Sequence, residues 1–135
     1  FVCVTCFFFL MSPRPPGSTL LPYTPLFRSE CDMLVSNPPY IGWCEANSLN
    51  RDIRDHEPHT ALFGGEFGDE LTRRLLQHVG GTLPENAVVM IEINSNRVNE
   101  LLKFVSELDI YQSPRILDDL AGLPRLLIAQ RGPQQ

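Results

Sequence analysis

The sequence predicts an α/β fold whose strands are parallel where helices intervene and whose last two strands form an antiparallel hairpin. Short apolar runs that suit buried strands alternate with amphipathic helical segments along the chain. Connections through helices produce parallel strands with right-handed crossovers. The last two apolar runs are too close in sequence for a helical crossover, so they are expected to pair as a hairpin.

The first expected strand is the apolar run "CDMLVS", residues 31–36, whose composition suits a strand buried on both faces. Pro38 and Pro39 end it, because neither can donate to a strand ladder and each restricts the residue before it. Residues 42–70 follow as a long polar stretch with little periodicity. Connections of that length are more often functional or mobile than short ones.

Two amphipathic helices are expected farther along the chain. The first spans residues 70–79, with Asp69 as N-cap and a stop at Gly80 and Gly81; its apolar residues are Leu71, Leu75, Leu76 and Val79. A second buried strand spans residues 87–93. The second helix follows Ser95 and Asn96 as its cap, with apolar residues Val98, Leu101, Leu102, Val105 and Leu108. The hairpin strands are expected within residues 111–119 and 124–131.

The stretch "VSNPPYIGW", residues 35–43, places an amide side chain at the carboxyl end of the first strand, where ligands bind in α/β sheets. The Asn37 carbonyl and the backbone carbonyl of Pro38, held extended by Pro39, are two acceptors that together can bind both N–H groups of an NH2 group. Tyr40 would stack on the planar group behind it. The alternative is that Asn37 only caps a turn, since Asn-Pro dipeptides favour turns.

Three segments carry a family resemblance. "DMLVSNPPYI", residues 32–41, resembles the motif of S-adenosylmethionine-dependent methyltransferases that modify exocyclic amines or amides of adenine, cytosine and glutamine. Residues 53–76 are similar to the segment after this motif in HemK-like peptide-chain-release-factor glutamine methyltransferases, and "DLAGLPR", residues 119–125, resembles their terminal hairpin. The resemblance covers residues 31–131 and implies the carboxyl-terminal half of a class I (Rossmann-like) methyltransferase sheet.

The resemblance also implies a reaction and a site. Asn37 and Pro38 would be the catalytic residues, and Asn37, Pro38, Pro39 and Tyr40 would bind the glutamine side chain of the Gly-Gly-Gln tip of a peptide chain release factor. Asn37 would also contact the cofactor, S-adenosylmethionine. The expected reaction is methyl transfer to the amide nitrogen, catalysed mainly by positioning. The partner would be a protein, and the enzyme would be cytoplasmic or organellar, with no membrane segment.

Two other functions remain open. An adenine-amine methyltransferase of DNA or RNA shares the Asn-Pro-Pro-Tyr motif, but it would need a basic groove, and the net charge of -5 disfavours nucleic acid as a partner. A non-catalytic α/β binding module is the third hypothesis for the function. The sequence contains no G-x-G turn of the kind that binds cofactors in doubly wound folds. We therefore expect the chain alone neither to bind the cofactor well nor to turn over.

The first 29 residues are expected to differ in origin from the rest of the chain. "TLLPYTPLFRS", residues 19–29, resembles the in-frame translation of a widely used sequencing-library adapter, differing at Leu21 and Pro25. The expected organisation is a non-native, disordered lead over residues 1–29, a partial methyltransferase domain over residues 30–132 and a tail over residues 133–135. A genuine Pro-rich linker is the alternative for the lead. Without it the chain has 9 basic and 16 acidic residues, a net charge of -7.

No metal site is expected. Cys3 and Cys6 form one C-x-x-C pair without the further ligands that zinc needs, and His56 and His59 are two histidines in a polar loop. The apolar opening, residues 1–11, is too short to span a bilayer, which takes about 20 residues.

Other polar positions are weaker candidates for the site. Glu57 and Arg54 either pair to order the loop or are solvated charges. Glu92 lies inside an apolar strand and needs a partner if it is buried, and it would face the site from a strand end. The glycines of "GGEFG", residues 64–68, indicate loop flexibility at a helix start and form no phosphate-binding loop.

Overall fold

The computed structural model describes residues 32–133. The expected lead, with Cys3, Cys6 and the adapter-like segment, lies outside the described residues, as do two of the three expected tail residues. Within residues 32–133 no helix is both long enough and apolar enough to cross a membrane.

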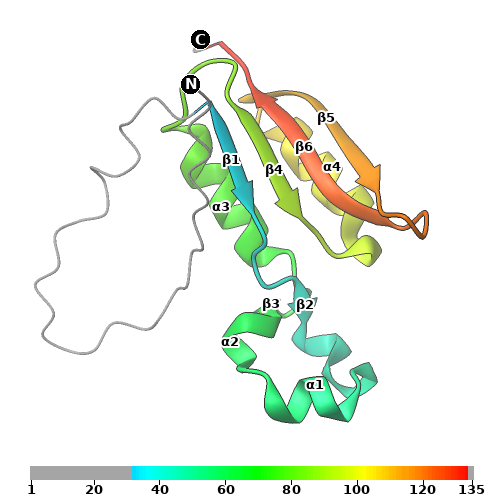
Figure 1. Cartoon of the computed structure of the whole chain (residues 1–135). Helices are drawn as coiled ribbons and strands as arrows, with labels where there is room; N and C mark the ends of the chain where they lie inside the picture. Colours follow the sequence, from blue (N-terminus) through cyan, green and yellow to red (C-terminus); the bar gives the residue numbers. More distant parts are fainter. Residues whose placement is uncertain (1–31, 134–135) are drawn as a thin grey trace, which may run out of the picture.

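A four-stranded mixed sheet forms the centre of the molecule, in the order β1-β4-β6-β5 (Figure 1). β1 (Met33–Ser36) pairs in parallel with β4 (Val88–Glu92), as expected for strands joined through a helix. β5 (Tyr111–Asp118) and β6 (Pro124–Arg131) form the expected antiparallel hairpin. β6 also pairs antiparallel with β4, so the last strand lies between β4 and β5. The predicted α/β class and terminal hairpin are confirmed.

Two amphipathic helices, α3 (Glu70–Gly80) and α4 (Val98–Glu107), lie side by side on one face of this sheet (Figure 1). Their apolar stripes pack on the sheet residues that point the same way, because residues i, i+3 and i+4 share one helix face. The buried side chains include Leu76, Val79, Val89, Ile91, Leu101, Val105 and Leu127. Both helices lie where the spacing of apolar residues predicts them.

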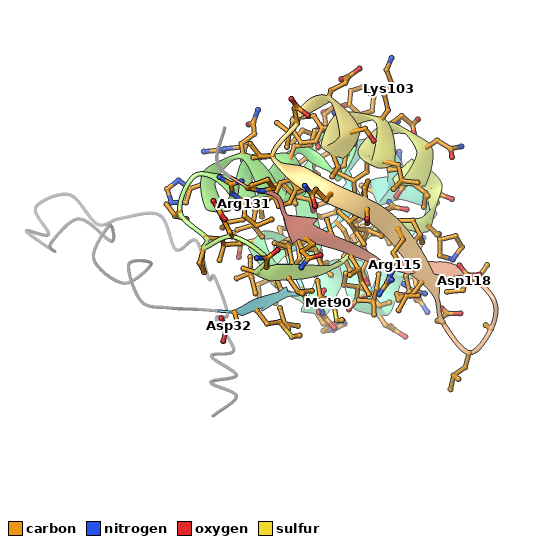
Figure 2. The ribbon with its side chains drawn as sticks, turned by 90° about the horizontal axis from the view of Figure 1, so that it is seen from above. Asp32, Met90, Lys103, Arg115, Asp118 and Arg131 are labelled. Atoms are coloured by element: carbon orange, nitrogen blue, oxygen red, sulfur yellow. The ribbon has the colours of Figure 1, made fainter. Side chains whose placement is uncertain are left out.

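The opposite face of the sheet carries no helix among the described residues. Figure 2 shows Met90 and Arg115 on the face of the sheet that is turned away from α4, the helix that carries Lys103. β4 accordingly alternates between buried and half-buried residues, and in β1 only Leu34 is buried. The expectation of a first strand buried on both faces is therefore wrong for the described residues, because helices cover one face only and β1 is an edge strand.

Residues 41–65 form a small helical lobe instead of the aperiodic loop that the sequence predicts. It contains the 3-10 helix η1 (Trp43–Ser48), α1 (Arg51–His56) and α2 (His59–Leu62). The parallel strands β2 (Ile41–Gly42) and β3 (Phe63–Gly65) close it at its base. Helices of four to six residues are too short to show a hydrophobic period, which explains why the pattern misses them. The lobe lies beyond the carboxyl ends of β1 and β4 (Figure 1).

The start of α3 is capped differently from the prediction. Asp69 makes no side-chain capping hydrogen bond; its carboxylate accepts two bonds from Arg73, at 2.9 and 2.8 Å. Instead, the Glu70 carboxylate accepts the backbone N–H groups of Phe67 and Gly68, both at 2.9 Å. Glu70 therefore holds the two loop residues that precede Asp69, and Asp69 pairs with arginine instead of capping α3.

α4 is preceded by a second 3-10 turn, η2 (Ser95–Arg97). Neither Ser95 nor Asn96 caps α4 as predicted. The capping side chain is that of Asn94, whose carbonyl accepts the backbone N–H of Asn96 at 2.9 Å. The cap thus belongs to the turn directly after β4, which brings Asn94 to the same edge of the sheet as the end of β1.

Candidate active site

The Asn-Pro-Pro-Tyr segment, residues 37–40, is called the elbow below. It follows directly on β1, whose last residue, Ser36, lies opposite Ile91 of β4. β4 ends one residue later at Glu92, and Glu92 lies opposite Leu126 of β6. The elbow therefore lies between the carboxyl ends of two parallel strands and the helical lobe, which is the usual ligand-binding edge of such a sheet.

Asn37 is exposed, whereas Pro38, the next residue, is buried. Within residues 32–133 no hydrogen bond engages the side chain of Asn37 or the backbone carbonyl of Pro38. A side-chain amide that capped a turn would accept a nearby backbone N–H, as Asn94 does. The described contacts thus leave the Asn37 amide available at the end of β1.

The other end of the elbow is fixed by its tyrosine. The Tyr40 hydroxyl donates a hydrogen bond to Glu92 Oε1 across 2.9 Å. Burial of the phenol, followed by the hydrogen bond and charge of Glu92, raises the pKa of Tyr40 above its usual value. The phenol is therefore neutral and donating at physiological pH, and Glu92 has the partner that a half-buried carboxylate requires.

The backbone of the elbow is held by Asn94. Its Nδ2 group donates to the carbonyl oxygen of Tyr40 and to Oε2 of Glu45, both at 3.1 Å. Glu45 Oε1 accepts a further bond from Asn96 Nδ2 at 3.2 Å. One amide thus joins the end of β4, the elbow and the helical lobe, which restricts the path of the chain after Tyr40.

Two glycines let a second stretch of backbone approach the elbow closely. A Cβ atom on Gly64 would collide with the carbonyl oxygen of Pro39, and one on Gly68 with the carbonyl oxygen of Tyr40. Gly68 also has a φ of +94°, which disfavours any residue with a side chain. These glycines allow contact rather than flexibility, so the sequence-based interpretation of "GGEFG" is corrected.

The β5–β6 turn reaches the same edge of the sheet. Arg125 donates to Asp119 Oδ2 from Nε and Nη2, at 3.2 and 2.9 Å, and its Nη1 lies 4.0 Å from Glu92 Oε1. Asp119 Oδ1 accepts the backbone N–H groups of Ala121 and Leu123 at 2.9 and 3.0 Å. The backbone bond from Leu123, then the bond from Arg125 and then the backbone bond from Ala121, lower the pKa of the Asp119 carboxyl. The turn is thus linked through Arg125 to Glu92.

The remaining polar candidates lie in the lobe, away from these contacts. Arg54 pairs with its neighbour Asp55 at 3.0 Å rather than with Glu57, so of the two alternatives left open for Arg54 and Glu57, the pair between them is not formed. The His59 ring packs edge-on against Phe63, with 5.6 Å between ring centroids. Among residues 32–133 no group of three or more His, Cys, Asp or Glu side chains is placed to hold a metal ion.

The sequence predicts the elbow and Glu92, but not the other residues that hold the elbow. Asn94 and Glu45 were not singled out, and Asp119 and Arg125 were noted only as part of a hairpin motif. One signal was available for Asn94: it follows the end of a strand, as Asn37 does, and parallel strands end at the same edge. No local signal marks Glu45, because its partners lie 49 and 51 residues away.

Comparison with known proteins assigns the chain to a family. The release factor glutamine methyltransferase of Koribacter versatilis is 34% identical over 100 residues, which is 74% of this chain and 35% of that protein. The enzyme of the same name from Clostridium acetobutylicum is 36% identical over 109 residues, covering 80% of this chain and 38% of the relative. The chain thus spans somewhat more than a third of the length of these relatives.

The fold has a solved counterpart. The crystal structure of a methyltransferase from Pyrococcus furiosus superposes with a TM-score of 0.51 at 19% identity, covering 76% of this chain and 41% of that chain. No model of a protein family matches the sequence. The fold is that of one half of a class I methyltransferase sheet. The sequence relatives described above share one name. The chain therefore belongs to the release factor glutamine methyltransferase family.

Proposed function

We propose that the chain contributes the substrate-amide site of an S-adenosylmethionine-dependent methyltransferase acting on the glutamine side chain of peptide chain release factors. The observation that carries the proposal is an Asn37 side chain left exposed and without a hydrogen bond within residues 32–133, on an elbow fixed by Tyr40, Asn94 and two glycines. A rigid acceptor at the ligand-binding edge of the sheet suits a primary amide.

In this proposal Asn37 and the backbone carbonyl of Pro38 accept the two N–H bonds of the glutamine amide. Pro39 keeps the peptide backbone extended between them and Tyr40. Tyr40 packs its ring on the planar amide, an arrangement that the neutral, donating phenol supports. The main catalytic contribution of these residues is positioning, since a correctly held nucleophile can lower the barrier by several kcal/mol, about 7–11 in favourable cases.

S-adenosylmethionine, when bound, supplies the methyl group. The exposed amide of Asn37 suits the neighbourhood of a positively charged methyl-sulfonium centre, because its carbonyl oxygen is an acceptor that makes no hydrogen bond within residues 32–133. We therefore assign Asn37 to the cofactor as well as to the substrate. The Gly-Gly-Gln tip of the release factor is the proposed target, which places the reaction where ribosomes work, in the cytoplasm or inside an organelle.

Nucleic acid is disfavoured as the substrate. The net charge is -5, and a DNA or RNA methyltransferase depends on basic residues to bind phosphates. The elbow residues alone do not distinguish an adenine amine from a glutamine amide, since both are planar NH2 groups. The relatives' names favour the amide.

The test is a chimera in which residues 32–133 replace the matching segment of the Koribacter versatilis relative. Incubated with tritiated S-adenosylmethionine, it should label a release factor on the Gly-Gly-Gln glutamine and leave adenine-containing DNA and RNA unlabelled. The unmodified relative is the positive control, and a release factor with Gln→Ala at the tip is the negative one. Labelling of DNA or RNA in preference to release factor would refute the proposal.

A further inference from the structure

Four side chains form a continuous set of contacts from the elbow to the turn between β5 and β6. Tyr40 donates to Glu92 at 2.9 Å, Arg125 lies 4.0 Å from the same Glu92 oxygen, and Arg125 binds Asp119 through two nitrogens. We call Tyr40, Glu92, Arg125 and Asp119 the rim network. Because they come from the elbow, β4, the start of β6 and the turn, only the folded sheet brings them together.

The rim network lies outside the hydrophobic core and contributes little to the stability of the fold. The side chains of Glu92, Arg125 and Asp119 are 26%, 35% and 25% exposed, and none belongs to the apolar cluster between sheet and helices. Partly exposed ion pairs typically stabilise a fold by no more than about 1 kcal/mol. Their larger effect is on geometry, because each contact removes a rotational freedom from its partner.

The geometry selects one orientation of the tyrosine ring. A phenol that donates to a fixed carboxylate cannot rotate away without losing that bond, and Glu92 is itself held by the positive charge of Arg125. Arg125 in turn is fixed by a carboxylate that already accepts two backbone N–H groups of the turn. The orientation of the Tyr40 ring thus depends on the terminal hairpin formed by β5 and β6.

We propose that Glu92, Arg125 and Asp119 are positioning residues, which fix the Tyr40 ring in the orientation needed to hold a planar NH2 group against the elbow. The role of the ring rests on the proposed function, whereas the fixing of the ring does not. A purely structural role for these residues would change the stability of the chain without a selective change at Tyr40.

The test is carbon-13 NMR of the complete 135-residue chain labelled at the Cζ atom of tyrosine. Tyr40→Phe assigns the Tyr40 signal. Tyr111, whose hydroxyl donates to the carbonyl of Leu76 at 2.7 Å, is an internal reference for the fold. Sharing of the phenolic proton with a carboxylate moves the Cζ signal downfield, toward the phenolate position. Loss of the Glu92 bond should therefore move it upfield.

The expected result is an upfield shift of the Tyr40 signal in Glu92→Ala and a smaller shift in the same direction in Arg125→Ala and Asp119→Ala. Glu92→Gln keeps an acceptor oxygen, so it should retain part of the downfield shift. The Tyr111 signal should not move in any of them. Glu107→Ala is the matched control, because it removes another paired carboxylate, 3.8 Å from Lys103 on α4, and should leave Tyr40 unchanged.

An unchanged Tyr40 signal in Glu92→Ala, with Tyr111 intact, would overturn the proposal. So would equal shifts of Tyr40 and Tyr111 in Arg125→Ala and Asp119→Ala, since that pattern reports a general loosening. No substrate or cofactor enters this measurement, so its outcome is independent of the chimera assay. If the shifts are as expected and the chimera methylates no release factor, the rim network is retained and the proposed function is refuted.

Discussion

The hydroxyl of Tyr40 and the carboxylate of Glu92 lie 2.9 Å apart although 52 residues separate them in sequence. The bond joins the residue that ends the elbow to the residue that ends β4. It exists because β1 and β4 are parallel neighbours whose carboxyl ends meet at one edge of the sheet.

Asn37→Ala in the chimera with the Koribacter versatilis relative should reduce release-factor methylation by about 10²–10³-fold in kcat, the size seen when one preorganised hydrogen-bonding group is lost from an active site. The side chain is exposed and makes no hydrogen bond within residues 32–133, so the unfolding midpoint in urea should stay the same. Asn47→Ala, at an exposed position in η1, is the control and should retain activity. Full methylation by the Asn37→Ala chimera would contradict the role assigned to this amide.

Gly64→Ala should destabilise the chain by about 1–3 kcal/mol, the usual cost of overpacking, because the added methyl group collides with the backbone of Pro39. Gly81→Ala is the matched control. Its added Cβ meets only the carbonyl oxygen of His78 at 3.8 Å, so it should change stability far less. Urea unfolding followed by circular dichroism measures the stability of both variants. Equal stability of the two variants would show that Gly64 does not lie close to the backbone of the elbow.

Ile91→Ala should lower the free energy of unfolding by about 2–5 kcal/mol, since the Ile91 side chain of β4 is fully buried between the sheet and the helices. Its neighbour Met90 points to the other face of the sheet, away from α4 (Figure 2). Met90→Ala should therefore cost clearly less in the same urea titration. A greater loss from Met90→Ala would mean that the helix-free face carries more of the stability than the described packing indicates.

Glu92→Gln should lower the pKa of Tyr40 toward its usual value near 10. The folded pKa is raised by burial and by Glu92, so this group stabilises the fold below pH 10 and the stabilisation is lost as pH rises through the folded pKa. The alkaline loss of stability should begin near the same pH in both proteins, because the unfolded pKa is unchanged, but it should be smaller and complete at lower pH in Glu92→Gln. Carbon-13 NMR titration of Tyr40 and urea midpoints at several alkaline pH values measure both effects; an unchanged Tyr40 pKa would contradict the assigned cause.

Isothermal titration of the 135-residue chain with S-adenosylmethionine should show no micromolar binding, whereas the chimera should bind. The sequence contains no G-x-G turn of the kind that binds cofactors in doubly wound folds, and Asn37 is the one residue of this chain that we propose to contact the cofactor. Injection of S-adenosylmethionine into buffer without protein controls for its heat of dilution. Micromolar affinity of the chain alone would disprove the expected dependence on the rest of the fold.

Local patterns predicted most of the elements. The alternation of apolar strands and amphipathic helices predicted β1, α3, β4, α4 and the hairpin in order, because hydrophobic periodicity within about ten residues reports which face of an element is buried. The prolines at positions 38 and 39 predicted the end of β1 and the elbow, since proline restricts its own backbone and that of its predecessor. The short helices of the lobe were missed, because four to six residues do not complete a readable period.

The sequence by itself determined the order of the sheet strands and the two long helices, the elbow and the family, since each depends on neighbouring residues or on matching segments. Only the tertiary structure decided that β6 lies between β4 and β5, and with it that Arg125 reaches Glu92 and that Glu92 meets Tyr40. Such pairs depend on which strands are neighbours and on their register. Burial of apolar area across the whole sheet selects that arrangement, and no local sequence signal encodes it.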